Sequence, residues 1–166
     1  VLQRYQQFLL KGISLLQLRL KNLGAEQRLH VIGHLRQHVH TEQRWLLNSD
    51  IGDADFPAQG LHLTANRLMA LTARPSGYQW VGASCHNLDE LQKAERLNLD
   101  FAVLSPVQVT TTHPDAQVLG WDVIEPILNA VKIPVYLMGG LKLTDLKQAQ
   151  EMGAQGLAGI TTFLDH

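Results

Sequence analysis

The sequence predicts a single α/β domain built as a (β/α)8 TIM barrel. Short apolar segments that resemble strands alternate strictly with segments of helical periodicity, which implies a parallel sheet. Seven such strand segments occur, close to the eight strands of a (β/α)8 barrel. Because the first strand and the last helix are missing from this pattern, we expect residues 1–166 to form one barrel domain, incomplete at both ends. The alternative is an open doubly wound sheet, which more often carries a glycine-rich loop after its first strand.

The spacing of apolar residues and the residues that start or stop helices define each element. Apolar residues at helical spacing predict helices, which capping residues, glycine and proline bound. The predicted helices span residues 1–11, 25–40, 66–73, 88–97, 121–131 and 144–151. The predicted strands span residues 13–20, 45–47, 60–63, 80–84, 101–104, 135–138 and 156–160. We expect Asn87 and Thr144 to be N-caps and Gly153 to end the last helix.

The first predicted strand has one apolar and one polar face. Successive side chains of a strand point to opposite faces, so residues 16, 18 and 20, all leucine, share one face. The opposite face carries Gln17, Arg19 and Lys21. Either these three residues point into a binding site at the barrel mouth, or the two cations simply form salt bridges inside the barrel.

Composition limits the classes of function. The chain is 45% hydrophobic and 17% charged, with a formal net charge of −1, so it lacks the basic surface typical of nucleic-acid-binding proteins. Neither an apolar run long enough to cross a membrane nor a signal peptide is visible. The single cysteine, Cys85, excludes an internal disulfide and fits a reducing cytoplasm. Strand alternation turns Cys85 outward, which predicts a buried, inert thiol.

The most informative stretch is residues 101–121, in which an apolar strand leads into a loop with two prolines and three successive threonines. In a barrel, the loops after the strands hold the ligand, and hydroxyl and backbone N–H groups suit a phosphate or another anion. Gly139 and Gly140, with Ile160 and Thr161, follow the last two predicted strands, where barrels commonly bind phosphate.

Each candidate also has a structural interpretation. The threonine loop and the glycine pair could be ordinary turns, and Ser84 with His86 could form the entry to a helix. His30, His34 and His38 have a spacing that could bind a metal on one helix face, but a solvated stripe is the preferred interpretation. Because these residues converge at strand ends, a functional interpretation of the set is favoured over the structural one.

Several motifs together resemble the thiamine-phosphate synthase/TenI superfamily. They run in order along almost the whole chain: QLRLK (17–21), LLNSD (46–50), GLHL (60–63), GASCH (82–86), LSPVQVTTTHP (104–114), GW (120–121), MGG (138–140) and GLAGIT (156–161). The resemblance implies a (β/α)8 barrel whose first strand would precede Val1. Some members of the superfamily are the C-terminal half of a chain that also carries a Nudix hydrolase domain, so a fused Nudix domain is a further expectation.

The resemblance to the synthases implies a role for each candidate. An aminopyrimidine diphosphate would lose pyrophosphate while the nitrogen of a thiazole phosphate attacks its methylene carbon. Arg19 and Lys21 would hold the diphosphate, and Gln17, Asn48 and Ser84 would face the pyrimidine. The thiazole phosphate would be bound by the remaining candidates, Thr110, Thr112, Gly139, Gly140, Ile160 and Thr161.

This chain departs from the synthase pattern where that pattern places Mg²⁺ ligands. The family expects Asp directly after Asn48, and here Ser49 stands there with Asp50 one residue later. A second Asp normally follows GLHL, and residues 64–67 contain none. Since Mg²⁺ prefers carboxylate and phosphate oxygens, Asp50 is the remaining candidate ligand. The family also expects Lys where this chain has His113, which exchanges a fixed charge for a titrating one.

Three hypotheses follow. The preferred one is a phosphate-binding barrel of thiamine biosynthesis close to the metal-free thiazole tautomerases, with His86 as the acid–base residue and Ser84 beside it. The second is a thiamine-phosphate synthase, a transferase that would use Mg²⁺. The third is a non-catalytic domain that senses a thiamine-related phosphate and tunes an attached hydrolase. In each, the partner is a small-molecule phosphate, with no nucleic acid or membrane, and a homo-oligomer stays open.

Overall fold

The computed structural model describes residues 13, 15–20, 23–38, 44–49, 59–110, 117–160 and 162–163. The predicted helix over residues 1–11 lies outside this part of the chain. Seven strands of one parallel sheet are described, in the sequential order β1-β2-β3-β4-β5-β6-β7. They are β1 (Leu15–Leu18), β2 (Arg44–Asn48), β3 (Gly60–Leu63), β4 (Trp80–Cys85), β5 (Phe101–Leu104), β6 (Val135–Leu137) and β7 (Gly156–Leu157).

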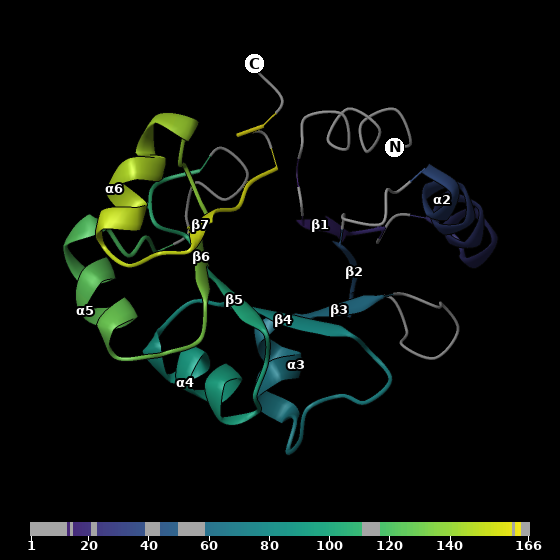
Figure 1. Ribbon diagram of the computed structural model, residues 1–166, viewed down its shortest axis with the longest axis horizontal. Coiled ribbons are helices and arrows are strands. Elements are labelled where there is room, and N and C mark those ends of the chain that lie inside the picture. The colour runs from purple at the N-terminus through teal and green to yellow at the C-terminus, as the bar shows by residue number, and fades with distance from the viewer. Residues whose placement is uncertain are drawn as a thin grey trace.

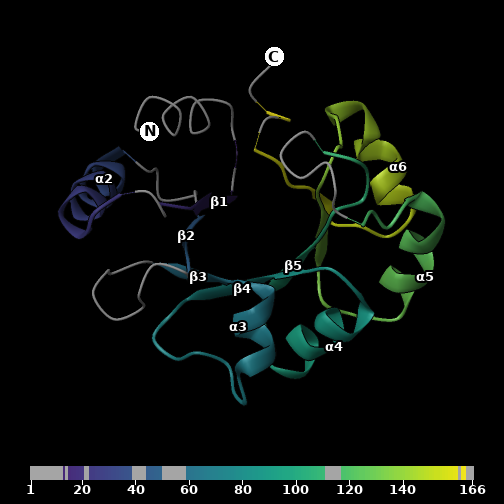
Figure 2. The same ribbon diagram turned by 180° about the vertical axis from the view of Figure 1, so that it is seen from behind.

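The sheet curls into part of a barrel, with the helices on its outer face (Figures 1 and 2). The helices are α2 (Ala25–His38), α3 (Ala65–Ala70), α4 (Leu88–Arg96), α5 (Ile124–Asn129) and α6 (Leu146–Glu151), with 3-10 turns η1 (Trp121–Val123) and η2 (Leu143–Asp145). The predicted barrel class is therefore confirmed. The doubly wound alternative is wrong, because such a sheet reverses its strand order and carries helices on both faces.

Strand alternation divides the side chains into an outer and an inner set. The outward residues of β3 to β6 pack against α3 to α6 in the largest apolar cluster, which includes Leu63, Leu104 and Leu137. The outward residues of β1 and β2 pack against α2 in a second cluster, built around Leu18 and Trp45. The predicted apolar face of the first strand is thus confirmed.

The inner face has its own apolar floor. Leu46, Phe101 and Val103 are buried there, and Trp80 and Tyr136 pack against them. Phe101 meets Tyr136 edge-on, with ring centroids 5.8 Å apart. Gly82 makes room for this floor, since a Cβ at Gly82 would collide with the Phe101 ring. The polar inward residues Asn48 and Ser84 lie beyond this floor, toward the carboxyl ends of β2 and β4.

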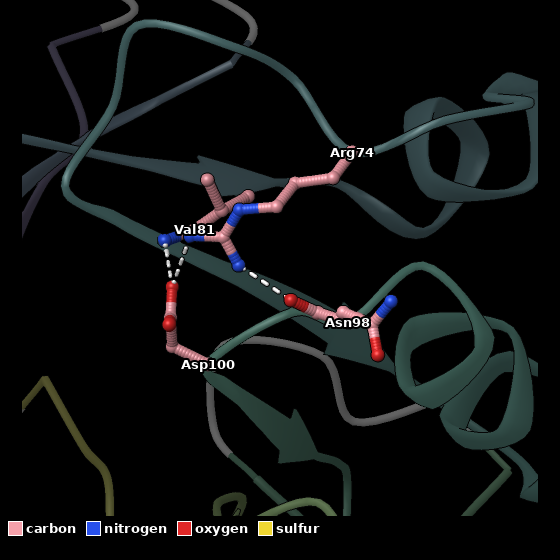
Figure 3. A network of polar contacts seen from close by, with 4 residues as sticks. All are labelled: Arg74, Val81, Asn98 and Asp100. Atoms are coloured by element: carbon pink, nitrogen blue, oxygen red, sulfur yellow. Dashed lines mark hydrogen bonds and ion pairs between the residues drawn. The ribbon is translucent and has the colours of Figure 1, made fainter.

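A polar network closes the opposite, amino-terminal end of β4 and β5 (Figure 3). Asp100 precedes β5, and its Oδ2 accepts hydrogen bonds from the Val81 backbone N–H at 2.6 Å and from Arg74 Nη2 at 2.7 Å. Arg74 also donates to the backbone oxygen of Asn98. The hydrogen-bonding groups of these residues pair with one another at the start of two neighbouring strands. The network therefore stabilises the fold at the end opposite the carboxyl ends of the strands.

Several predicted boundaries are corrected by the structure. The helix predicted over residues 66–73 ends at Ala70, where Leu71 turns extended ahead of Pro75. The helix predicted from Trp121 begins as a 3-10 turn and ends at Asn129. The last strand is shorter than predicted and ends at Leu157.

The predicted caps have mixed outcomes. Asn87 does cap α4, its side chain accepting from the Glu90 backbone N–H at 3.0 Å. Gly153 follows α6 with φ +97°, as a helix-ending glycine does. Thr144 is not the cap of the last helix. Instead, the Asp145 carboxylate accepts from the Lys142 backbone N–H at 2.7 Å and starts the preceding 3-10 turn.

Candidate functional site

Polar inward-facing side chains from neighbouring strands meet at the carboxyl edge of the curled sheet. Asn48 is the last residue of β2 and pairs in register with His62 of β3. Ser84 is the next inward residue of β4 beyond Gly82, which pairs with His62. Asn48 and His62 are buried, whereas Gln17 and Arg19 at the end of β1 are exposed. These five residues, which we call the strand-end rim, come from four neighbouring strands at the carboxyl end of the sheet.

The centre of the strand-end rim is a hydrogen bond between His62 and Ser84. His62 Nε2 lies 2.9 Å from Ser84 Oγ, and the imidazole contacts the Phe101 ring with centroids 5.9 Å apart. Burial lowers the pKa of His62 to about 4, because desolvation disfavours the charged imidazolium. His62 is therefore neutral near pH 7, with one ring nitrogen that donates and one that accepts, and Nε2 holds the Ser84 hydroxyl in place.

His86 lies one strand step beyond Ser84 but has a different partner. Its Nδ1 lies 2.7 Å from the backbone oxygen of Ser105. Since a carbonyl oxygen only accepts, Nδ1 carries the proton, and the Nε2 of a neutral His86 is an acceptor. The backbone N–H of His86 donates to Glu90 Oε2 at 2.6 Å. The His86 ring is thus oriented from the loop after β5 rather than by Ser84.

The loops after β5 and β6 are fastened to each other. Val107 donates its backbone N–H to the Met138 oxygen, and Gln108 donates to the Gly139 oxygen, both at 3.0 Å. Gly139 and Gly140 have φ of +103° and +68°, and a Cβ on Gly139 would lie 2.7 Å from Pro106 Cα. Only glycine satisfies both the conformation and the close approach. Residues 107 and 108, at the start of the loop after β5, therefore lie beside the glycine pair.

Ser49 and Arg67 link the ends of β2 and β3. Ser49 is buried, and its three polar groups are engaged: the backbone N–H donates to the His62 oxygen at 2.9 Å, and the hydroxyl accepts from the Thr64 N–H at 3.2 Å. Its backbone oxygen accepts from Arg67 Nη1 at 3.4 Å. Arg67 projects from α3, whose N-cap is Thr64. A guanidinium thus reaches from α3 to the end of β2.

The structure brings most described candidates to one edge of the barrel. The residues in the last two positions of a strand, or after it, are Gln17, Arg19, Asn48, Ser84, His86, Thr110, Gly139, Gly140 and Ile160. Ile160 is exposed and extends beyond β7. The remaining candidates, Lys21, Asp50, Thr112, His113 and Thr161, lie outside the described residues.

Two residues of this edge, His62 and Arg67, had no role assigned from the sequence. His62 alternates with Leu61 and Leu63 in GLHL, and this alternation was the signal that could have placed it on the inner face. Arg67 gave no such signal, because a basic residue near the start of a short helix is common on protein surfaces.

The sequence also raises two other candidate centres, Cys85 and the histidines of α2. Cys85 is buried among outward apolar side chains, as predicted. Burial first, and the nearby Glu90 second, raise the pKa of its thiol to about 12. His30 is exposed on α2, and within the described part of the chain no three His, Cys, Asp or Glu side chains gather closely enough to hold a metal ion.

Comparison with known proteins identifies the family. The sequence model of the family described as "Thiamine monophosphate synthase" matches residues 1–163. The chain belongs to the thiamine monophosphate synthase family. The predicted resemblance is thereby confirmed, and with it the assignment to thiamine biosynthesis, whereas the fused Nudix domain stays a prediction.

Relatives within the thiamine monophosphate synthase family carry matching names. The chain is 31% identical over 167 residues to "Putative thiamine-phosphate synthase 2" of Aquifex aeolicus, covering 99% of this chain and 90% of the relative. It is also 31% identical to the thiamine-phosphate synthase of Herpetosiphon aurantiacus, covering 93% and 76%. It spans about half, 48%, of the thiamine-phosphate synthase of Synechococcus, at 29% identity over 99% of this chain.

A solved structure with the same fold is the thiamine phosphate pyrophosphorylase of Pyrococcus furiosus. It superimposes with a TM-score of 0.70 at 20% identity, covering 96% of this chain and 78% of that one. At this identity the similarity supports the barrel fold alone. None of the helices in the described residues has both the length and the apolar composition that crossing a bilayer would demand.

Proposed function

We propose that the chain is the barrel of a thiamine-phosphate synthase. It would join the nitrogen of a thiazole phosphate to the methylene carbon of an aminopyrimidine diphosphate. A C–N bond forms, the C–O bond to the diphosphate breaks, and pyrophosphate leaves with the electron pair. The observation that carries this proposal is the family match over residues 1–163, together with relatives named as synthases. These findings favour transferase chemistry over the tautomerase that the sequence alone favoured.

Different residues of the strand-end rim would bind the pyrimidine ring and the diphosphate. Asn48 and Ser84 are partly or fully buried beside an aromatic floor, which suits a flat heterocycle with polar edges. The neutral His62 is a positioning residue, because it holds the Ser84 hydroxyl. Arg19, exposed at the end of β1, would meet the diphosphate by charge-assisted hydrogen bonds.

The thiazole phosphate is assigned to the joined loops after β5 and β6. Thr110 ends the described part of the first loop, and the left-handed glycines Gly139 and Gly140 follow β6. Their backbone lets a phosphate approach closely, which a Cβ would prevent. Thr112, His113, Ile160 and Thr161 extend this proposal on the strength of the sequence motif.

The resemblance implies Mg²⁺, but the described residues do not fit it. The residue directly after Asn48 is Ser49, whose hydroxyl already accepts from Thr64. The segment after β3 offers a hydroxyl, an amide and a guanidinium in place of a carboxylate. Mg²⁺ requires hard oxygen ligands in a near-octahedral shell, so no step of the proposed reaction is assigned to a metal.

The deciding experiment is a condensation assay. The protein is mixed with aminopyrimidine diphosphate and thiazole phosphate, with Mg²⁺ or with EDTA, and thiamine phosphate is measured by chromatography. Product above the enzyme-free blank supports the synthase. The Ser84→Ala variant should lower kcat/KM by roughly tenfold to a hundredfold, as expected for the loss of one hydrogen bond to a substrate group. No product under either condition would overturn the proposal.

One observation favours a second candidate, the thiazole tautomerase. Because Ser105 fixes the protonated Nδ1 of His86, the opposite ring nitrogen is available as a proton acceptor. Following the thiazole tautomer by ultraviolet absorbance, in the wild type and in His86→Ala, tests this role. Equal rates would reject it. If both assays are silent while calorimetry shows thiazole phosphate binding, the non-catalytic sensing domain is the better explanation.

A further inference from the structure

The ends of β2 and β3 carry a fixed positive charge where the family resemblance leads one to expect a metal. Ser49 is 2% exposed, and its neutral hydroxyl already accepts a hydrogen bond from the Thr64 N–H. A neutral, buried hydroxyl is a weaker ligand for Mg²⁺ than the carboxylate that the resemblance implies at this position, so Ser49 is a poor metal ligand. The same residue accepts a hydrogen bond from the Arg67 guanidinium through its backbone oxygen.

A guanidinium at this place opposes a divalent cation and favours an anion. It stays protonated at every working pH, and its planar fork of five N–H donors matches phosphate oxygens. The positive charge of this guanidinium would repel a Mg²⁺ ion bound close to it. Arg19 adds a further cation at the exposed end of β1, the strand next to β2. The two side chains thus flank the end of β2 with positive charge.

We propose that this chain binds the diphosphate of its substrate without a resident magnesium ion, the Arg67 guanidinium supplying the positive charge at the ends of β2 and β3. The inference rests on the proposed function only for the identity of the anion. The inference goes beyond the proposed function because it assigns the neutralisation of the diphosphate to a side chain of α3 rather than to an exchangeable dication.

Calorimetry with inorganic pyrophosphate tests this directly. For the wild type, the Kd should differ little between buffer with EDTA and buffer with millimolar Mg²⁺. Arg67→Gln keeps a polar side chain of similar reach but removes the charge, and it should weaken pyrophosphate binding in EDTA by about tenfold or more. Arg96→Gln, which removes an exposed arginine from α4 on the outer face, is the matched control and should bind as the wild type does.

A second variant reverses the charge. Arg67→Asp should bind pyrophosphate in EDTA more weakly than Arg67→Gln, because like charges repel, and Mg²⁺ should restore part of its affinity. Thermal melting of each variant checks that the barrel stays folded. Binding by the wild type only in the presence of Mg²⁺, or equal affinity of Arg67→Gln and the wild type in EDTA, would overturn the proposal.

The same experiments separate this inference from the synthase proposal. Pyrophosphate binding that needs Arg67 and no metal, in a protein that forms no thiamine phosphate, supports the inference and rejects the synthase. Product formation with strictly Mg²⁺-dependent pyrophosphate binding supports the synthase and rejects the inference.

Discussion

At the scale of single residues, His62 is the least expected side chain of the molecule. It is 2% exposed, contacts the Phe101 ring and bonds Ser84. A buried imidazole is tolerated when it is neutral and hydrogen-bonded. The consequence is that the protein must expel a proton from His62 in order to fold at acid pH.

This consequence predicts a pH dependence of stability. The folded pKa of about 4 lies below the unfolded value of 6.5, so the unfolded chain binds more protons between these values and stability falls as pH falls through that window. Above pH 6.5 neither the folded nor the unfolded chain holds this proton, and the free energy of unfolding has its full value. By pH 4 the free energy of unfolding has fallen by roughly 3 kcal/mol. Urea unfolding between pH 4 and 7 measures it.

Two variants separate the imidazole from its hydrogen bond. His62→Gln should flatten the pH dependence, because no titrating ring is buried any longer. Ser84→Ala should keep the slope, since desolvation is the cause of the shift and the ring stays buried. A slope unchanged in His62→Gln would contradict this account.

At the scale of elements, helix ends are set by single side chains. The Asn87 side chain accepts from the Glu90 backbone N–H and starts α4, while Asp89 and Glu90 place negative charge in its first turn. We predict that Asn87→Ala lowers the free energy of unfolding by about 1 kcal/mol. Asn129→Ala, at the exposed end of α5, is the matched control and should change it by a few tenths. Urea unfolding at pH 7 compares them, and equal losses would argue against the cap.

Two glycines in different elements should respond to alanine with opposite signs. At Gly82 in β4, a Cβ would strike the Phe101 ring, so Gly82→Ala should cost about 1–3 kcal/mol of stability. At Gly33 in the middle of α2, a Cβ would meet nothing within 4 Å, so Gly33→Ala should add about 1 kcal/mol. Denaturant midpoints measure both effects, and a neutral Gly82→Ala would mean that the barrel floor is loosely packed.

At the scale of the whole molecule, the two ends of the curled sheet carry different kinds of polar contact. The amino-terminal end holds the closed Arg74–Asp100 network (Figure 3), in which each group satisfies another. The carboxyl end holds the strand-end rim, in which side chains converge from successive strands. Barrel proteins commonly separate stability from function in this way.

This separation predicts a variant that loses stability and keeps activity. Asp100→Ala removes the acceptor of the Val81 N–H and of Arg74, so the free energy of unfolding should fall by about 1–3 kcal/mol. Because Asp100 precedes β5 at the opposite end from the rim, pyrophosphate binding measured below the melting temperature should be unchanged. A parallel loss of binding would show that the two ends are coupled.

The boundaries of elements were less predictable than their order. Phe101–Leu104 coincides with its predicted range, because a continuous apolar run bounded by Asp100 and Ser105 is unambiguous. The last strand was predicted too long, since how far a strand continues depends on pairing with its neighbour, here β6. The cap at Thr144 was predicted wrongly because Thr144 lies inside the 3-10 turn Leu143–Asp145 that precedes α6.

The local periodicity of the chain predicts the order of the elements, the barrel class and the inward face of each strand. A period of two residues fixes that Gln17, Asn48 and Ser84 face the interior, wherever their strands lie. The partners of those side chains are decided only by tertiary structure. His62 meets Ser84, and Arg67 meets Ser49, across different elements, because strand register and helix placement, which no local pattern encodes, set which atoms come within hydrogen-bonding distance.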